Sequence, residues 1–226
     1  MSFLRVLCTT ILFGCVCFLP VERVSAAESA ASTTQRDMLG VTTTTTVISN
    51  IPSNIDIEEL RRYWLDQVNA LRVKRNLRAL ISDDRFVDTA TEWSTHMAKV
   101  GRATHVRKNG QSMHAWIATR GVTFTKRNSV DGWKRNYFSE NIAWDYTQNS
   151  MTGAKKALDN ALRFMLAEAK TNGPHYRTIY HPDWNAVGVG FFFKPIGKGK
   201  YQLFTTMHYG SVVSPGKIEL DLENQP

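Results

Sequence analysis

Two histidines and two glutamates are the residues of this sequence that we consider first as candidates for metal binding or proton transfer. His105 lies in Thr-His-Val, Glu140 lies in Ser-Glu-Asn-Ile-Ala-Trp, and His175 follows Glu168 after a Gly-Pro pair. Imidazole and carboxylate groups can bind a metal or exchange a proton near neutral pH. A lone histidine in a loop is more often a surface or structural residue. The residues by themselves therefore make these four side chains candidates.

The short motifs of common enzymes are missing from the chain. The sequence has no Gly-x-Ser-x-Gly elbow, no His-Glu-x-x-His helix and no phosphate-binding Gly-Lys-Ser/Thr loop. Ser94 and Ser139 are conceivable nucleophiles, but their spacing does not distinguish them from ordinary polar residues. The sequence therefore supplies no direct argument for an enzyme.

The first 27 residues are typical of a cleaved export signal. Arg5 precedes an apolar run from Val6 to Leu19, and Val24-Ser25-Ala26 supplies small residues for cleavage. The apolar run is shorter than the roughly 20 residues that a membrane span needs. Lipid attachment at Cys15 is an alternative, which the bulky Phe13 disfavours. We expect a secreted or extracytoplasmic protein (periplasmic, cell-surface or extracellular) that is not transmembrane after cleavage.

All cysteines lie in this signal segment, at Cys8, Cys15 and Cys17. A mature chain without cysteine has no disulfides, no thiol nucleophile and no cysteine-ligated metal. Residues 28–55 are rich in Ser and Thr without a helical period, which predicts a tether. We expect the folded domain over residues 56–213 and a C-terminal tail over residues 214–226.

Three stretches of the domain have apolar residues at helical spacing. They predict a helix over about 56–76, a second that follows Asp83 and Asp84 and stops at Gly101, and a third over about 152–169. Their expected buried faces are Leu60, Trp64, Val68 and Leu71; Val87, Ala90, Trp93, Met97 and Val100; and Leu158, Leu162, Met165 and Ala169.

Strands are expected late in the chain. Residues 186–194 alternate and are rich in Val and Phe, and residues 201–209 form their partner through a hairpin at 197–199. Residues 142–144 predict a short element, and residues 102–139 a long loop region. Helices followed by antiparallel strands indicate an α+β fold.

Four motifs occur in order across residues 57–212. They are Val68-Asn69-Ala70-Leu71-Arg72; Trp93, Met97 and Gly101 before His105; Ser139-Glu140-Asn141-Ile142-Ala143-Trp144; and His175-Tyr176-Arg177-Thr178-Ile179 with Asn185-Ala186-Val187-Gly188-Val189-Gly190. Together they resemble the cysteine-rich secretory, antigen 5 and pathogenesis-related superfamily, known as the CAP or SCP domain. The absence of mature cysteines resembles the bacterial type.

The resemblance implies a three-layer α-β-α sandwich around a central, mainly antiparallel sheet. It also implies that His105, Glu140, Glu168 and His175 form a cavity tetrad, in which the two histidines bind zinc or another divalent cation. Two histidines leave positions open for water, and a neighbouring carboxylate can act as a base. Alternatively, the glutamates merely accept hydrogen bonds. The family pattern Trp-x-x-Glu has Met165 in place of Trp here.

Positive charge is concentrated between the first two tetrad residues. The chain has a net charge of +8, and residues 106–136 contain Arg107, Lys108, Arg120, Lys126, Arg127, Lys134 and Arg135 against Asp131 alone. Aromatic residues such as Trp116 and Trp133 accompany them. One interpretation is a solvated loop, and the other is a rim that recognises anionic headgroups or polymers. Export argues against a nucleic-acid partner. The lone His114 is interpreted as structural or exposed.

Three functional hypotheses follow from this sequence. The first is a secreted module that binds a lipid, a sterol or an anionic envelope component, with a divalent-metal cavity. The second is a metal-dependent hydrolase or peptidase that uses the tetrad. The third is an extracellular interaction or adhesion protein in which the tetrad is structural.

Overall fold

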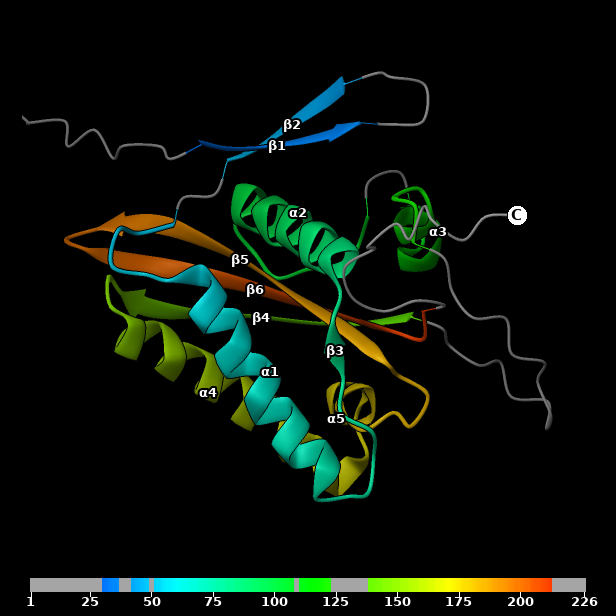
Figure 1. Ribbon diagram of the computed structural model, residues 1–226. Coiled ribbons are helices and arrows are strands. Elements are labelled where there is room, and N and C mark those ends of the chain that lie inside the picture. The colour runs from blue at the N-terminus through cyan, green and yellow to red at the C-terminus, as the bar shows by residue number, and fades with distance from the viewer. Residues whose placement is uncertain (1–29, 37–41, 49–50, 108–109, 123–137, 213–226) are drawn as a thin grey trace, which may run out of the picture.

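Helices cover both faces of a central sheet in this chain (Figure 1). The computed structural model describes residues 30–36, 42–48, 51–107, 110–122 and 138–212. Helices α2 (Asp84–Val100) and α3 (Met113–Ala118) lie on one face, and α1 (Ile57–Val73), α4 (Met151–Ala167) and α5 (Pro174–Ile179) lie on the other. The expected three-layer α+β architecture is confirmed.

The sheet contains four strands in the order β3-β5-β6-β4. Strand β5 (Ala186–Gly197) and strand β4 (Phe138–Gln148) both pair antiparallel with β6 (Lys200–Gly210), whereas the two-residue β3 (Ile81–Ser82) runs parallel to β5. The predicted hairpin between β5 and β6 is confirmed. Its turn has positive φ angles at Gly197, Lys198 and Gly199, a conformation that glycine adopts readily.

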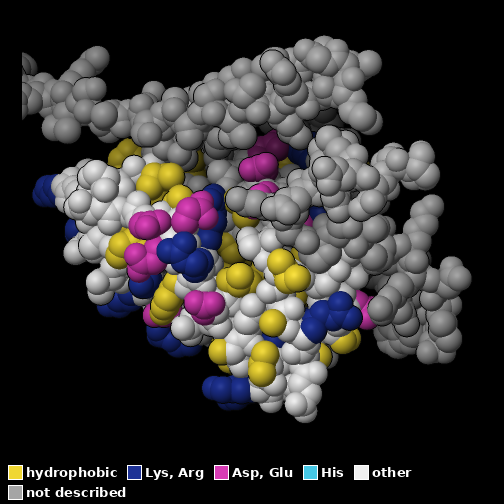
Figure 2. Space-filling view, viewed as in Figure 1, with side chains coloured by type: hydrophobic (Ala, Val, Ile, Leu, Met, Phe, Trp, Pro, Cys, Tyr) yellow, Lys and Arg dark blue, Asp and Glu magenta, His cyan; other side chains and the backbone are white. Residues whose placement is uncertain are grey.

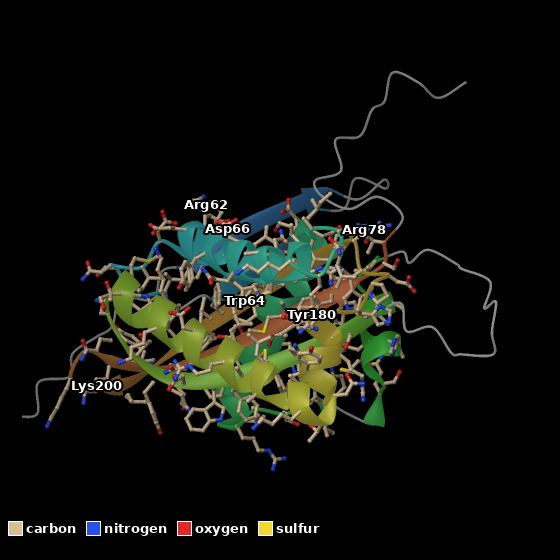
Figure 3. The ribbon with its side chains drawn as sticks, turned by 90° about the horizontal axis from the view of Figure 1, so that it is seen from below. Arg62, Trp64, Asp66, Arg78, Tyr180 and Lys200 are labelled. Atoms are coloured by element: carbon tan, nitrogen blue, oxygen red, sulfur yellow. The ribbon has the colours of Figure 1, made fainter. Side chains whose placement is uncertain are left out.

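Each helical layer has its own apolar core against the sheet. On one face Trp64 of α1 and Met165 of α4 pack on β5 and β6, and on the other Phe86 and Trp93 of α2 pack with Phe138. Figure 3 shows this arrangement on α1, where Trp64 points inward while Arg62 and Asp66 point away from the sheet. Burying apolar surface on both faces is the main force that holds these layers together.

Helix α2 lies directly on β5 because two strand residues lack side chains. A β carbon on Gly188 would be 2.2 Å from the backbone of Phe86, and one on Gly190 would be 2.0 Å from the Thr91 nitrogen. Gly101, with φ of 76°, ends α2 in the left-handed conformation. These contacts fix the position of the chain that continues to His105.

The Asn-x-x-Arg motif of α1 ties the helix to distant segments. The Asn69 side chain bonds both the N–H and the C=O of Leu80, before β3. The buried Arg72 guanidinium donates to carbonyl oxygens of four residues, Arg78, Ile179, His181 and Trp184. Three of these follow the last turn of α5 or belong to it, so Arg72 holds the end of the helix that carries His175.

The structure differs from the sequence expectations in several places. Strand β4 has eleven residues instead of a short element at 142–144, and α3 lies within the expected loop region. Strands β1 (Ala30–Arg36) and β2 (Thr42–Ile48) pair antiparallel inside the expected tether, where β-branched threonines favour extended backbone. Ala169 and Val100 are exposed rather than buried. No helix in the described ranges is both long and apolar enough to cross a membrane.

Candidate functional site

The four candidate residues form two histidine–carboxylate pairs. His105, beyond the end of α2, places its Nδ1 atom 2.8 Å from Oε1 of Glu140 on β4. His175, in the first turn of α5, places its Nδ1 atom 2.6 Å from Oε1 of Glu168, which directly follows α4. The structure thus brings the four candidates together in two pairs, whose members are 35 and 7 residues apart in the sequence.

The Glu140 carboxylate is buried and accepts four hydrogen bonds. Arg107 donates to both oxygens, over 2.9 and 2.5 Å, and His208 Nε2 donates to Oε2 over 2.8 Å. The fourth donor is His105. A carboxylate has about four lone-pair positions for acceptance, so no position of Glu140 is left for a metal or a substrate proton.

Arg107 is itself held between two indole rings. Its guanidinium carbon lies 3.6 Å from the centre of the Trp93 ring and 4.6 Å from that of Trp116. Cation–π contacts of this kind are strongest where water is excluded. Arg120 covers Trp116 as well, at 4.0 Å, and pairs with Glu92.

These contacts correct the interpretation of the basic segment as a free rim at two of its positions. Arg107 is a buried partner of Glu140, and Arg120 is occupied by Glu92 and Trp116. The aromatic residue Trp116 belongs to the core under α2. The other basic residues of the segment lie outside the described residues; they are Lys108, Lys126, Arg127, Lys134 and Arg135.

The charges around Glu140 fix its ionisation. Burial by itself would raise the pKa of Glu140, but hydrogen bonds from Arg107, His105 and His208 outweigh burial and hold this pKa far below its usual range. Burial lowers the pKa of His208, despite the attraction of Glu140. His208 therefore stays neutral, with Nε2–H donating to Glu140 and the Thr89 hydroxyl 2.9 Å from Nδ1.

The carboxylate of the second pair is more exposed than that of the first. Glu168 Oε2 accepts the backbone N–H groups of His175, over 2.8 Å, and Tyr176, over 3.4 Å, yet the Glu168 side chain is 22% exposed. Partial burial raises the pKa of Glu168, while the bonds from His175 lower it, with a net decrease. Gly173 makes room for this carboxylate, because a β carbon there would lie 2.5 Å from Oε2.

Strand β4 connects the two pairs through adjacent residues. Glu140 points to the α2 face of the sheet, whereas Asn141 points to the opposite face and donates to the His175 carbonyl oxygen over 3.2 Å. The Ser139 hydroxyl also lies 2.8 Å from the Thr178 hydroxyl of α5. A single stretch of β4 therefore positions one pair directly and the helix of the other pair.

Both histidines of the pairs are held in the same tautomer. The Nδ1 atom of each faces a carboxylate and so carries the proton, which leaves a lone pair on Nε2 of His105 and of His175. Within the described part of the chain neither Nε2 atom has a hydrogen-bond partner, and the His105 side chain is 45% exposed. The residues that the structure describes contain no group of three or more His, Cys, Asp or Glu side chains arranged to hold a metal.

A shallow cleft of about 260 Å³ lies elsewhere, between α1, the start of α2 and β5. Its lining includes Arg61, Arg62 and Asp84 but none of the candidate residues. Figure 2 shows acidic and basic side chains intermingled on the face that carries α1. The cleft is therefore separate from the two histidine–carboxylate pairs.

Sequence reasoning missed Arg107, His208 and Thr89 as parts of the site. The available signal was His208, which lies between Met207 and Tyr209 and whose register places it opposite Glu140. Of the other candidates, Ser94 has a structural role, because its hydroxyl donates to the Gly190 carbonyl, whereas His114 is exposed on α3.

Comparisons with known proteins give one family. The model of the cysteine-rich secretory protein (CAP) family matches residues 65–209. A search of the curated proteins finds no match. An extracellular protein containing an SCP domain from Bacillus anthracis str. Ames is 18% identical, with a TM-score of 0.48. That likeness covers 68% of this chain and only 41% of the other.

Two further solved structures are similar to a comparable degree. An outer surface protein of Borrelia burgdorferi is 17% identical, with a TM-score of 0.45, over 70% of this chain and 96% of that one. The CAP domain of enterococcal PrgA is 20% identical, with a TM-score of 0.44, over 74% and 69% of the two chains.

Proposed function

The chain belongs to the cysteine-rich secretory protein (CAP) family, and we propose that it is an extracytoplasmic binding domain that takes a divalent cation through Nε2 of His105 and His175. The observation that carries this proposal is the shared tautomer, since each Nδ1–H donates to a carboxylate. Metal-binding histidines usually donate their other nitrogen in this way, and neutral imidazole suits zinc. The signal-like first 27 residues support the location outside the cytoplasm.

The two carboxylates have different parts in this proposal. Glu140 is saturated by donors of its own chain, so it orients His105 and neither binds the cation nor takes a proton. Glu168 orients His175 but retains exposed surface and acceptor capacity. A cation bound by two imidazoles would keep open positions and supply Lewis acidity to a bound water or ligand.

Metal binding by the purified domain tests the proposal. Calorimetric titration with zinc is expected to show one bound equivalent of zinc for the wild type. It should show none for the double variant His105→Ala/His175→Ala. His114→Ala is the matched control, because that histidine is exposed and outside both pairs; it should bind like the wild type. Equal binding by the wild type and the double variant, or no binding by either, would contradict the proposal.

A metal-dependent hydrolase or peptidase is the second candidate. It is favoured by Glu168, the one carboxylate of the tetrad that is partly exposed and able to assist a bound water. This candidate predicts a chelator-sensitive activity on casein that is lost in Glu168→Gln. An activity that survives both chelation and this substitution would exclude the tetrad as its source.

A lipid, sterol or anionic envelope component is the ligand class that the sequence suggested. This ligand class is supported by the five basic residues of the 106–136 segment that are not Arg107 or Arg120. They are Lys108, Lys126, Arg127, Lys134 and Arg135. Reversing their charge should weaken sedimentation with vesicles that contain phosphatidylserine, and unchanged sedimentation would remove this ligand class. The adhesion hypothesis has no observation of its own.

A further inference from the structure

An arginine just beyond the end of α1 lies against two tyrosine rings at the protein surface. The guanidinium carbon of Arg75 lies 3.8 Å from the centre of the Tyr180 ring and 5.1 Å from that of the Tyr176 ring. Its Nη1 atom donates to the Tyr176 hydroxyl. The two rings also contact each other, with centres 4.8 Å apart. Stacking and this hydrogen bond together hold the guanidinium in one orientation.

A structural tie between α1 and α5 is already supplied by another residue. Arg72, one turn earlier in α1, is buried and donates to the carbonyl oxygens of Ile179 and His181. Arg75 is exposed instead, and a cation–π contact at an exposed site contributes little to stability. Its ordered guanidinium is therefore available to a ligand from solution.

Hydrogen-bond donors of Arg75 and Tyr176 lie next to each other here. The bond to Tyr176 uses one of the five N–H groups of Arg75, and no residue in the described ranges accepts a bond from the other four. The Tyr176 hydroxyl accepts that bond, so its own hydrogen is free to donate, and the neighbouring cation strengthens it as a donor. An oxyanion can accept from the guanidinium and from this hydroxyl at once, because the guanidinium fork matches phosphate and carboxylate geometry.

The turn that follows α1 adds positive charge next to Arg75. Lys74 and Arg78 are both exposed, and within the part of the chain that the structure describes neither forms an ion pair. Asn76, with a φ of 56°, reverses the chain between them. Figure 3 shows Arg78 and Tyr180 toward the same end of the molecule. This turn therefore presents three cations close together in the sequence.

Positive charge exceeds negative charge at this end of the protein. Residues 73–81 and 168–184 contain five basic residues, Lys74, Arg75, Arg78, Lys170 and Arg177, against the two acidic residues Glu168 and Asp183. Glu168 is already bonded to His175. A phosphate monoester carries a charge of about −1.5 to −2 at pH 7, whereas a carboxylate carries a single charge. The excess of positive charge therefore favours phosphate over carboxylate.

We propose that Arg75 and Tyr176 form a binding site for a phosphate group. The guanidinium N–H groups and the tyrosine O–H donate to the phosphate oxygens, the Tyr180 ring supports the guanidinium from one face, and Lys74 supplies further positive charge. The site differs from the basic 106–136 segment and goes beyond cation binding, because it uses neither histidine of the two pairs.

Inorganic phosphate is the first probe of this site. The ¹⁵N-labelled protein is titrated at fixed ionic strength in a phosphate-free buffer that contains a chelator, which removes any bound cation. NMR follows the Arg75 Nε–H signal and the backbone amides of residues 74–78. Phosphate should shift these signals saturably, and acetate should bind about tenfold more weakly because it carries one charge. No saturable shift with phosphate, or equal affinity for the two anions, would overturn the proposal.

Matched variants separate binding from a structural role. Arg75→Lys keeps the charge but loses the fork, and Tyr176→Phe keeps the ring but loses the hydroxyl, so each should weaken phosphate binding about tenfold. Arg62→Lys changes another exposed arginine of α1 and should bind like the wild type. The urea midpoints of all three should stay at the wild-type value. A lowered midpoint for Tyr176→Phe with unchanged phosphate affinity would make Arg75 a structural tie and refute the site.

Two sources share this chemistry, a lipid headgroup and a soluble phosphate monoester. Vesicles of phosphatidic acid and phosphatidylcholine that sediment the wild type but not Tyr176→Phe would identify the lipid headgroup. Glycerol phosphate that binds the wild type about tenfold more tightly than Tyr176→Phe, without sedimentation by vesicles, would identify a soluble ligand. Equal sedimentation of the two proteins, together with no binding of glycerol phosphate, would contradict the proposal.

Discussion

Replacing Arg107 by Met tests the interpretation of Glu140 as a buried, saturated anion. The substitution keeps much of the side-chain volume but removes the two bonds of 2.9 and 2.5 Å to the carboxylate. The side chains of both partners are buried, with 1% exposure for Arg107 and none for Glu140. Removing one partner of such a pair leaves an uncompensated charge, which costs about 3–5 kcal/mol of the free energy of unfolding.

The loss should depend on pH in a defined direction. In the wild type the pKa of Glu140 is lowered, so its stabilising contribution is present above the unfolded value of about 4.3 and is lost as pH falls through the folded pKa. Without Arg107, burial becomes the larger effect and raises the pKa of Glu140. The buried carboxyl then takes up a proton on acidification, so the deficit relative to the wild type should shrink between pH 7 and pH 5.

Urea unfolding followed by tryptophan fluorescence measures both effects. The matched control is Arg120→Met, because Arg120 also covers Trp116 and pairs with a glutamate but its side chain is 30% exposed. That pair should contribute less than about 1 kcal/mol. Equal losses in the two variants, or a deficit for Arg107→Met that does not change with pH, would refute the description of Glu140 as a buried anion held by Arg107.

Three other substitutions have expected outcomes. Burial lowers the pKa of His208, so wild-type stability should fall as pH drops below the unfolded value of about 6.5. His208→Gln should remove that part of the pH dependence, and urea midpoints that still follow the wild-type profile would contradict it. Gly190→Ala should lose about 3 kcal/mol by urea unfolding, because its β carbon would lie 2.0 Å from the Thr91 nitrogen; a wild-type midpoint would be inconsistent with this packing. Arg72→Met leaves four carbonyl groups without their donor and should lose about 3–5 kcal/mol, which a thermal melt near that of the wild type would disprove.

The helices were predictable because their signals are local. Asp56 and Asp83 cap α1 and α2, and Gly101 ends α2 as expected. The length of β4 was not predictable, because its pairing depends on β6, which lies some 60 residues away in the chain. Its burial also alternates only in part, since both faces of the strand are covered near Glu140. A hydrophobic period of two is weak in such a strand.

The members of the candidate site could be nominated from the sequence as far as the motifs extend. The resemblance identified His105, Glu140, Glu168 and His175, and the structure joins them in two pairs. The role of Arg107 was hidden, because a basic residue in a charged segment indicates solvent exposure. Only the tertiary structure places it between two tryptophans, where its charge neutralises a buried carboxylate.

The difference between the two glutamates limits which functions the site can support. Four donors already occupy Glu140, so the candidate site offers one available carboxylate rather than two. A mechanism that needs one carboxylate has Glu168, together with the Nε2 atoms of the two histidines. Converting Glu140 to Gln should therefore change stability more than ligand binding, whereas Glu168→Gln should change binding more than stability. A site in which both substitutions affect binding equally would require Glu140 to leave its donors.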